Sequence, residues 1–115
     1  MMSLALLLAL YQPPAAAWVE RGLPHVESRC DRWAVSSRGA RGRWQVVPRW
    51  SRLPGWAMVL PGLGEWEGRR ILRRWQRRCG GDVVCALRCY ACGRRGLAGA
   101  CAGYAAAVRA AGGGE

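Results

Sequence analysis

The sequence lacks Lys, Phe, Asn and Thr altogether, and it has a single Ile and a single His. Without Asn there is no acceptor for N-glycosylation, and without Lys there is neither a phosphate-binding lysine nor a Schiff-base nucleophile. The one histidine, His25, is expected in a solvated loop, and Asp31 and Asp82 are the only aspartates of the chain. We therefore expect neither an enzyme nor a bound cofactor.

Acidic residues are scarce as well. The 115 residues carry 18 basic side chains, all of them Arg, against 7 acidic ones, and the formal net charge is +11. This imbalance favours an acidic partner, such as a polyanion or an anionic membrane surface. The length leaves room for one domain, which can bury only a modest core unless cross-links help to hold it together.

The abundant residues are Ala, Arg and Gly, which share GC-rich codons. An alternative origin is therefore a GC-rich, overlapping reading frame. Such a frame would encode a viral or other accessory protein that binds host protein or nucleic acid, or a product with no selected function. Arginine without lysine suits bidentate contacts with phosphate, as in nucleic acid. Retention of the protein in the cytosol or nucleus with reduced thiols would favour this accessory protein over a secreted one. Rapid degradation would favour the absence of function.

The N-terminal segment has the pattern of a secretory signal. Residues 4–11 form an apolar run, which is followed by Gln12, two prolines and the small residues 15–17. A short apolar region before a small-residue cleavage site is typical of a signal peptide, and the run is too short to span a bilayer. We predict that residues 1–17 are removed, that the mature chain begins at Trp18, and that the protein is secreted.

Six cysteines lie beyond the predicted cut, and an even number in a short secreted chain predicts three disulfides. They are Cys30, Cys79, Cys85, Cys89, Cys92 and Cys101. One stripe on a predicted helix holds three of them, Cys85, Cys89 and Cys92. These three must find partners on neighbouring segments, because disulfide geometry disfavours bridges within a helix. The nearest candidates are Cys79 and Cys101, and Cys30 is available to tether the N-terminal region.

Two patterns of cysteine spacing offer metal binding as an alternative to disulfides. The spacing Cys85-x3-Cys89-x2-Cys92 resembles the cluster-binding loop of radical-SAM enzymes, but only residues 93–115 follow it, so no barrel can be built. The segment Cys89-x2-Cys92-Gly93 resembles half of a zinc knuckle, which Cys79, Cys85 or Cys101 would complete. Zinc becomes the better interpretation only if the protein is cytosolic.

Residues 18–64 are expected to be extended and rich in Trp, Arg and Pro. Up to Arg43 the chain shows little periodicity, and residues 43–61 repeat a pattern of Trp, a spacer, Val or Leu, and Pro. Regular prolines favour polyproline-like segments. In composition this stretch resembles Trp/Pro/Arg-rich host-defence peptides, which implies that Trp44, Trp50 and Trp56 are displayed for stacking or insertion. The alternative is that these rings form the core of a chain without Phe.

Residues 65–115 are expected to hold two or three short helices. The clearest, over 65–79, places Gly68, Ile71, Leu72, Trp75 and Cys79 on one arc. Its opposite face carries Arg69, Arg70, Arg73, Arg74, Arg77 and Arg78, with Trp66 among them. A second helix is predicted from its N-cap Asp82 to Gly93, and a third over 97–111.

Together these patterns predict a small α-rich, disulfide-stabilised fold with an extended N-terminal half. The arginine face and the tryptophans predict that the protein is secreted and binds polyanions or anionic membranes. A protein receptor is a further possible partner, and nucleic acid would be one only if the chain is not secreted.

Overall fold

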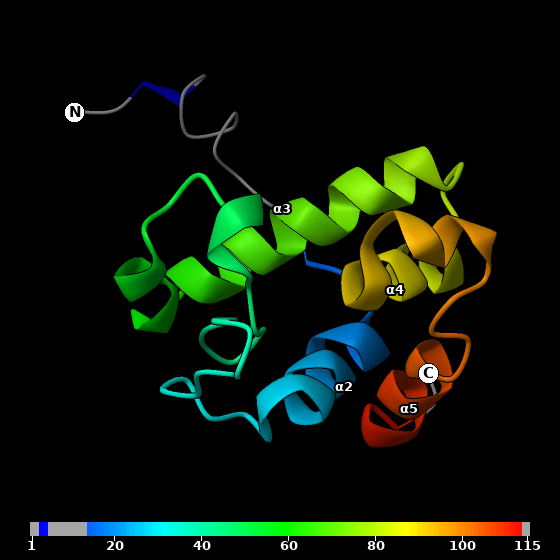
Figure 1. Ribbon diagram of the computed structural model, residues 1–115. Helices are drawn as coiled ribbons and strands as arrows, with labels where there is room; N and C mark the ends of the chain where they lie inside the picture. The colour runs from blue at the N-terminus through cyan, green and yellow to red at the C-terminus, as the bar shows by residue number, and fades with distance from the viewer. Residues whose placement is uncertain (1–2, 5–13, 114–115) are drawn as a thin grey trace.

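Four α-helices and three short 3-10 helices make up the regular structure of the described residues, 3–4 and 14–113, in this computed structural model. The α-helices are α2 (Ala17–Ser28), α3 (Leu63–Arg78), α4 (Val83–Cys92) and α5 (Tyr104–Ala111), and the 3-10 helices are η1 (Pro48–Trp50), η2 (Gly55–Val59) and η3 (Gly93–Ala98). Helices α2 and α5 lie side by side, and α3 runs across the opposite side of the molecule with α4 between them (Figure 1). Most of the predicted signal peptide lies outside the described residues. The α-rich, disulfide-stabilised fold is confirmed.

Helix α2 occupies much of the segment predicted to be loop. This helix is difficult to predict from the sequence, because Gly22 and Pro24 both disfavour a helix interior. Its buried residues are Trp18, Val19, Gly22, Leu23 and Pro24. Burial of this apolar face compensates for the poor local propensity, so tertiary packing decides the conformation here.

Two glycines bring α2 and α5 into close contact. A Cβ on Gly22 would lie 1.9 Å from the carbonyl oxygen of Val108, and a Cβ on Gly112 would lie 1.9 Å from that of Trp18. The Nε of Arg21 also donates to the Gly112 carbonyl at 2.8 Å. Only residues without a side chain permit this approach, so the contact depends on glycine at both positions.

The Trp/Pro repeat forms turns instead of an extended ribbon. Pro48 is the first residue of η1, and Pro54 is the N-cap of η2. The fixed φ of proline suits the start of a helical turn as well as a polyproline segment. The extended conformation predicted for residues 18–64 is therefore not confirmed.

The three tryptophans of the repeat have different surroundings. Trp44 is 1 % exposed and packs on α3, where a Cβ on Gly68 would come within 2.6 Å of the ring. Trp50 and Trp56 are 49 % and 67 % exposed. The prediction of a displayed ring is wrong for Trp44, because this large apolar group packs against Gly68 of α3 and Tyr90 of α4. The alternative, a tryptophan in the core, is confirmed for this residue.

Helix α3 confirms the amphipathic pattern. Gly68 and Leu72 are buried, and Ile71 and Trp75 pack partly buried against the core. The core draws apolar residues from all four α-helices and from the Trp/Pro segment. Of the arginines of α3, Arg74, Arg77 and Arg78 are exposed, whereas Arg69, Arg70 and Arg73 are partly buried.

Helix α4 starts where the sequence predicts. The Asp82 carboxylate accepts hydrogen bonds from the backbone N–H groups of Val84 and Cys85 at 2.9 and 3.3 Å. The single helix predicted over 97–111 is instead divided into η3 and α5. Gly99, in the left-handed conformation at φ 99°, ends η3, since glycine adopts this conformation without strain.

Two disulfides link α4 to its neighbours. They are Cys79–Cys85 and Cys92–Cys101, with Cα separations of 5.8 and 6.2 Å. Each joins one residue of the predicted stripe to a cysteine outside α4, so the expected partners Cys79 and Cys101 are confirmed. These bridges are compatible with an extracellular protein.

The predicted third bridge is not formed. Cys30 is an exposed thiol and Cys89 is a buried one. Because one sulfur lies at the surface and the other in the core, they cannot pair, and Cys30 does not tether the N-terminal region. Within the described ranges, no helix is both long enough and apolar enough to cross a bilayer.

Candidate functional site

An open groove of about 800 Å³ lies between α3, α4 and the segment that leads into η1. A smaller hollow of about 110 Å³ adjoins it and shares Trp50, Ile71 and Trp75 with its lining. We call the two together the arginine groove, because six arginines line it: Arg38, Arg49, Arg74, Arg78, Arg94 and Arg95. Among the residues that the structure describes, no Asp or Glu lines this groove.

All six groove arginines are exposed. None takes part in the ion pairs found within residues 3–4 and 14–113, which use Arg43, Arg69 and Arg70. Six like charges from four separate segments therefore face one concave surface, and no carboxylate of residues 3–4 and 14–113 lies in its lining. Such a concave surface concentrates positive potential and attracts anions.

Aromatic and aliphatic side chains form the apolar part of the groove. Trp75 and Ile71 come from α3, and Trp50 stands at the end of η1. The guanidinium of Arg49 lies 5.0 Å from the Trp50 ring centroid, and that of Arg78 lies 5.5 Å from the Trp75 ring. Stacking holds these arginines near the groove while their charge stays available to a ligand.

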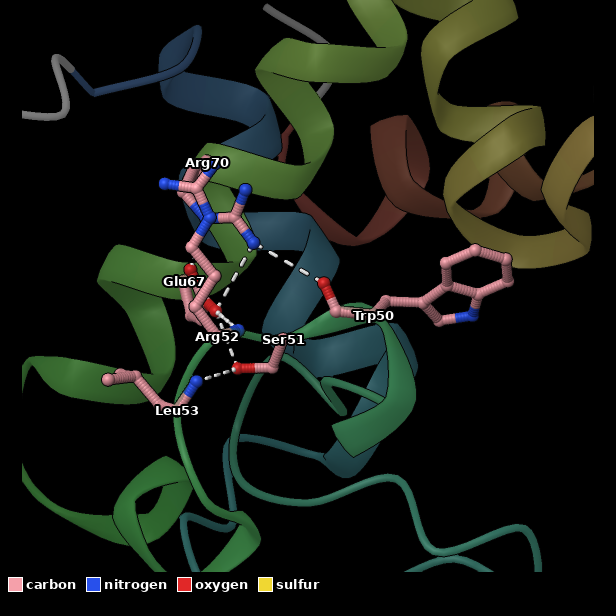
Figure 2. A network of polar contacts seen from close by, with 6 residues as sticks. All are labelled: Trp50, Ser51, Arg52, Leu53, Glu67 and Arg70. Atoms are coloured by element: carbon pink, nitrogen blue, oxygen red, sulfur yellow. Dashed lines mark hydrogen bonds and ion pairs between the residues drawn. The ribbon is translucent and has the colours of Figure 1, made fainter.

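A buried carboxylate positions the Trp50 side of the groove. Glu67 of α3 is 0 % exposed and accepts hydrogen bonds from the Ser51 hydroxyl at 2.5 Å and the Arg52 backbone N–H at 2.7 Å. Arg70 donates to the same carboxylate and, at 3.3 Å, to the carbonyl of Trp50. Figure 2 shows Glu67 and Arg70 of α3 in contact with the turn that carries Trp50.

These contacts lower the pKa of Glu67. Burial alone would raise it, but the hydrogen bonds from Arg70, Ser51 and the Arg52 N–H, together with the charge of Arg70, outweigh that effect. Glu67 is thus an ionised structural anchor at neutral pH.

The opposite side of the groove is held by α4. The Tyr90 hydroxyl donates to the Trp44 carbonyl at 2.6 Å and fixes α4 against the loop before η1. Burial raises the pKa of Tyr90 well above its ordinary value, so it remains a neutral donor. The Nε of Arg88 donates to the Gly96 carbonyl at 3.1 Å, and the Cys92–Cys101 bridge closes the segment that carries Arg94 and Arg95.

The predicted arginine face of α3 is divided by the fold. Arg74 and Arg78 line the groove, and Arg77 is exposed outside its lining. Arg69 is committed to Glu20 of α2 through two hydrogen bonds of 2.8 and 2.7 Å, and Arg70 is committed to Glu67. The prediction that Arg69 and Arg70 are displayed for a ligand is therefore wrong, because both hold α3 to other segments.

The remaining predicted binding residues lie outside the groove. Arg73 and Trp66 are partly buried, and Trp56 is exposed on η2. The sequence analysis did not predict four of the arginines that line the groove, which are Arg38, Arg49, Arg94 and Arg95. The one local sign of a basic site was the adjacent pair Arg94–Arg95, directly after the predicted end of the helix at Gly93. Nothing in the spacing of Arg38 or Arg49 indicates that these residues lie near that pair in the fold.

The cysteines form a second cluster beside the groove. The Sγ of the free Cys89 lies 4.0 Å from that of Cys79, and the sulfurs of Cys79, Cys85 and Cys89 all lie within 4.8 Å of one another. Cys92, which the zinc-knuckle interpretation required, is instead bonded to Cys101.

Comparison of the chain with protein-family models, curated proteins and solved structures finds no match.

Proposed function

We propose that this is a secreted binding protein whose arginine groove takes an anionic polymer, such as a sulfated polysaccharide. The single observation that carries the proposal is the convergence of six exposed arginines on one groove, in whose lining the described part of the chain places no carboxylate. A polymer with regularly spaced anionic groups meets several of these charges at once, so weak individual contacts add up.

The shape of the site favours a chain-like polyanion over a membrane surface. The arginines surround a hollow, whereas a bilayer would be met best by protruding apolar residues. Trp50 and Trp75 offer flat rings on which a sugar or other ring can lie between charged contacts. Two disulfides are compatible with delivery to an extracellular ligand.

The test is a titration of the oxidised protein with heparin at increasing salt, using paired variants. Replacing Arg94 and Arg95 by Gln should weaken binding roughly tenfold, if each exposed contact contributes up to about 1 kcal/mol. The control replaces Arg29 and Arg32 by Gln, since both are exposed, lie outside the groove, and remove the same charge. Affinity should fall as salt rises.

Three results would contradict this assignment. Equal losses in the two variants would mean that net charge and not the groove binds heparin. Tighter binding to anionic vesicles, with a blue shift of Trp emission, would identify a membrane as the partner. Tighter binding to single-stranded nucleic acid would favour the intracellular alternative, in which Trp50 stacks on bases.

Secretion is a separate part of the proposal. Cleavage after Ala17 would remove only the first residue of α2, and the ring of Trp18 would remain under the Arg109 guanidinium, 4.7 Å from it. Intact mass of the product from a secreting cell should correspond to a chain starting at Trp18 that gains about four mass units on reduction. A full-length product found only inside the cell would contradict secretion.

A further inference from the structure

The free thiol of Cys89 and the Cys79–Cys85 bridge place three sulfurs in one cluster. Cys79 is the C-cap of α3, Cys85 lies in the first turn of α4, and Cys89 follows Cys85 by four residues on the same face of α4. The glycine turn 80–81 folds the end of α3 back toward α4. The grouping is thus built by two helices and the short turn between them.

We infer that the reduced chain binds one Zn²⁺ ion through Cys79, Cys85 and Cys89. When all three are thiols, binding releases three protons and forms three Zn–S bonds. In the oxidised chain the sulfurs of Cys79 and Cys85 are bonded to each other. A thiol or phosphine reductant must supply two electrons, and water two protons, to convert this bridge into the two thiols that the metal site needs. The metal site uses the three thiols of the reduced chain, whereas the proposed polyanion binding uses the arginines of the oxidised protein, so the two can be tested separately.

The spacing of the sulfurs suits zinc. Zn–S bonds of about 2.3 Å in a tetrahedral site separate the sulfurs by about 3.8 Å. The Cys79 and Cys89 sulfurs are already 4.0 Å apart. After reduction, the 5.8 Å between the Cα atoms of Cys79 and Cys85 leaves their side chains free to rotate to such a separation. Three sulfur ligands leave the fourth zinc position to water or another donor.

The chemistry of the cluster selects a thiophilic ion. Its only potential ligands are sulfurs, and thiolate sets favour zinc or copper(I) over Mg²⁺ or Ca²⁺. Three thiolates and Zn²⁺ carry a net charge of −1. Burial raises the pKa of the Cys89 thiol, and the positive charges of Arg88 and Arg78 oppose this only in part. Cys89 also lies in the lining of the arginine groove, which offers an entry path.

The first experiment maps the site in the unmodified chain. The full chain is reduced with a phosphine under anaerobic conditions, mixed with Zn²⁺ alone, and alkylated for increasing times before mass spectrometry. Cys79, Cys85 and Cys89 should react slowly when zinc is present, while Cys30, Cys92 and Cys101 should react as fast as without it. Protection of a different set, or no protection, overturns the inference.

The second experiment measures stoichiometry and ligand identity by competition with a chromophoric chelator. One Zn²⁺ per chain is expected, and Cys89→Ser should weaken binding by roughly a hundredfold or more, because one of three ligands is lost. The matched control is Cys30→Ser, which removes an exposed thiol outside the cluster and should leave the affinity unchanged. Equal affinity in the two variants would overturn the site, whatever the outcome with heparin.

Discussion

Glu67 and Arg70 form an ion pair within α3 whose carboxylate is fully buried and whose guanidinium also reaches the carbonyl of Trp50. The pair therefore joins helix α3 to the turn at the edge of the arginine groove. Ser51 and the Arg52 backbone N–H complete the shell of donors around the carboxylate (Figure 2). A change at Glu67 should affect both the stability of the fold and the position of Trp50.

Replacing Glu67 by Ala is expected to lower the free energy of unfolding by about 3–5 kcal/mol, because Arg70 loses its partner in a partly buried place. Urea denaturation followed by circular dichroism measures this loss. The control is Glu65→Ala on the same helix, whose carboxylate lies 4.0 Å from Arg43 and should contribute less than about 1 kcal/mol. Similar losses in both variants would contradict the structural role of Glu67.

The carboxyl group of Glu27 should have the opposite pH dependence to that of Glu67. Burial raises the pKa of Glu27 above its ordinary value of 4.5, although the hydrogen bond from Tyr104 partly opposes this. Because the folded state binds this proton more tightly, the stabilisation is present at low pH and is lost as pH rises through the folded pKa. Glu67, with its lowered pKa, stabilises the fold above its unfolded pKa and stops doing so as pH falls through the folded pKa.

The variant Glu27→Gln isolates this effect, since its amide oxygen can still accept from Tyr104 and does not titrate. We expect its stability relative to the wild type to increase as pH rises from about 4 to about 8. Urea midpoints measured across this range give the comparison. A difference between the two proteins that stays constant with pH would contradict the raised pKa.

The close contact of α2 with α5 predicts a strong effect of a single methyl group. Gly22→Ala would place a Cβ 1.9 Å from the Val108 carbonyl oxygen, so the helices must separate at a cost of about 1–3 kcal/mol. Thermal unfolding measures it. Gly103→Ala is the matched control, because it has no atom within 4 Å of the added Cβ and a negative φ of −80°. Its stability should change little, and an equal loss there would argue against the packing explanation.

The Cys92–Cys101 bridge should matter for binding as well as for stability. Replacing both cysteines by Ser removes a constraint on a short loop and should cost about 2–3 kcal/mol. Because the loop carries Arg94 and Arg95, heparin affinity should also fall under conditions in which the variant is still folded. Titration of folded variant with heparin is the measurement. Unchanged affinity would mean that these arginines need no fixed position.

The local signals in the sequence were sufficient where the structure depends on near neighbours. The arc of Gly68, Ile71, Leu72 and Trp75 predicted the buried face of α3, and Asp82 predicted the start of α4. Periodicity and capping act within one or two turns, so they can be recognised without knowledge of the fold. The same locality explains why helix α2 was not predicted. The poor helix propensity of Gly22 and Pro24 can be read from the sequence, and the packing that offsets it cannot.

By itself, the sequence determined the charge, the absence of Lys and the α-rich character of this protein, because these follow from composition and short-range pattern. Which arginines line the groove depends on the tertiary structure. Arg69 and Arg70 follow the same helical pattern as Arg74 and Arg78, yet the former pair meets Glu20 and Glu67 while the latter pair lines the groove. Ion pairing and burial depend on residues distant in the chain, and a local pattern carries no information about them.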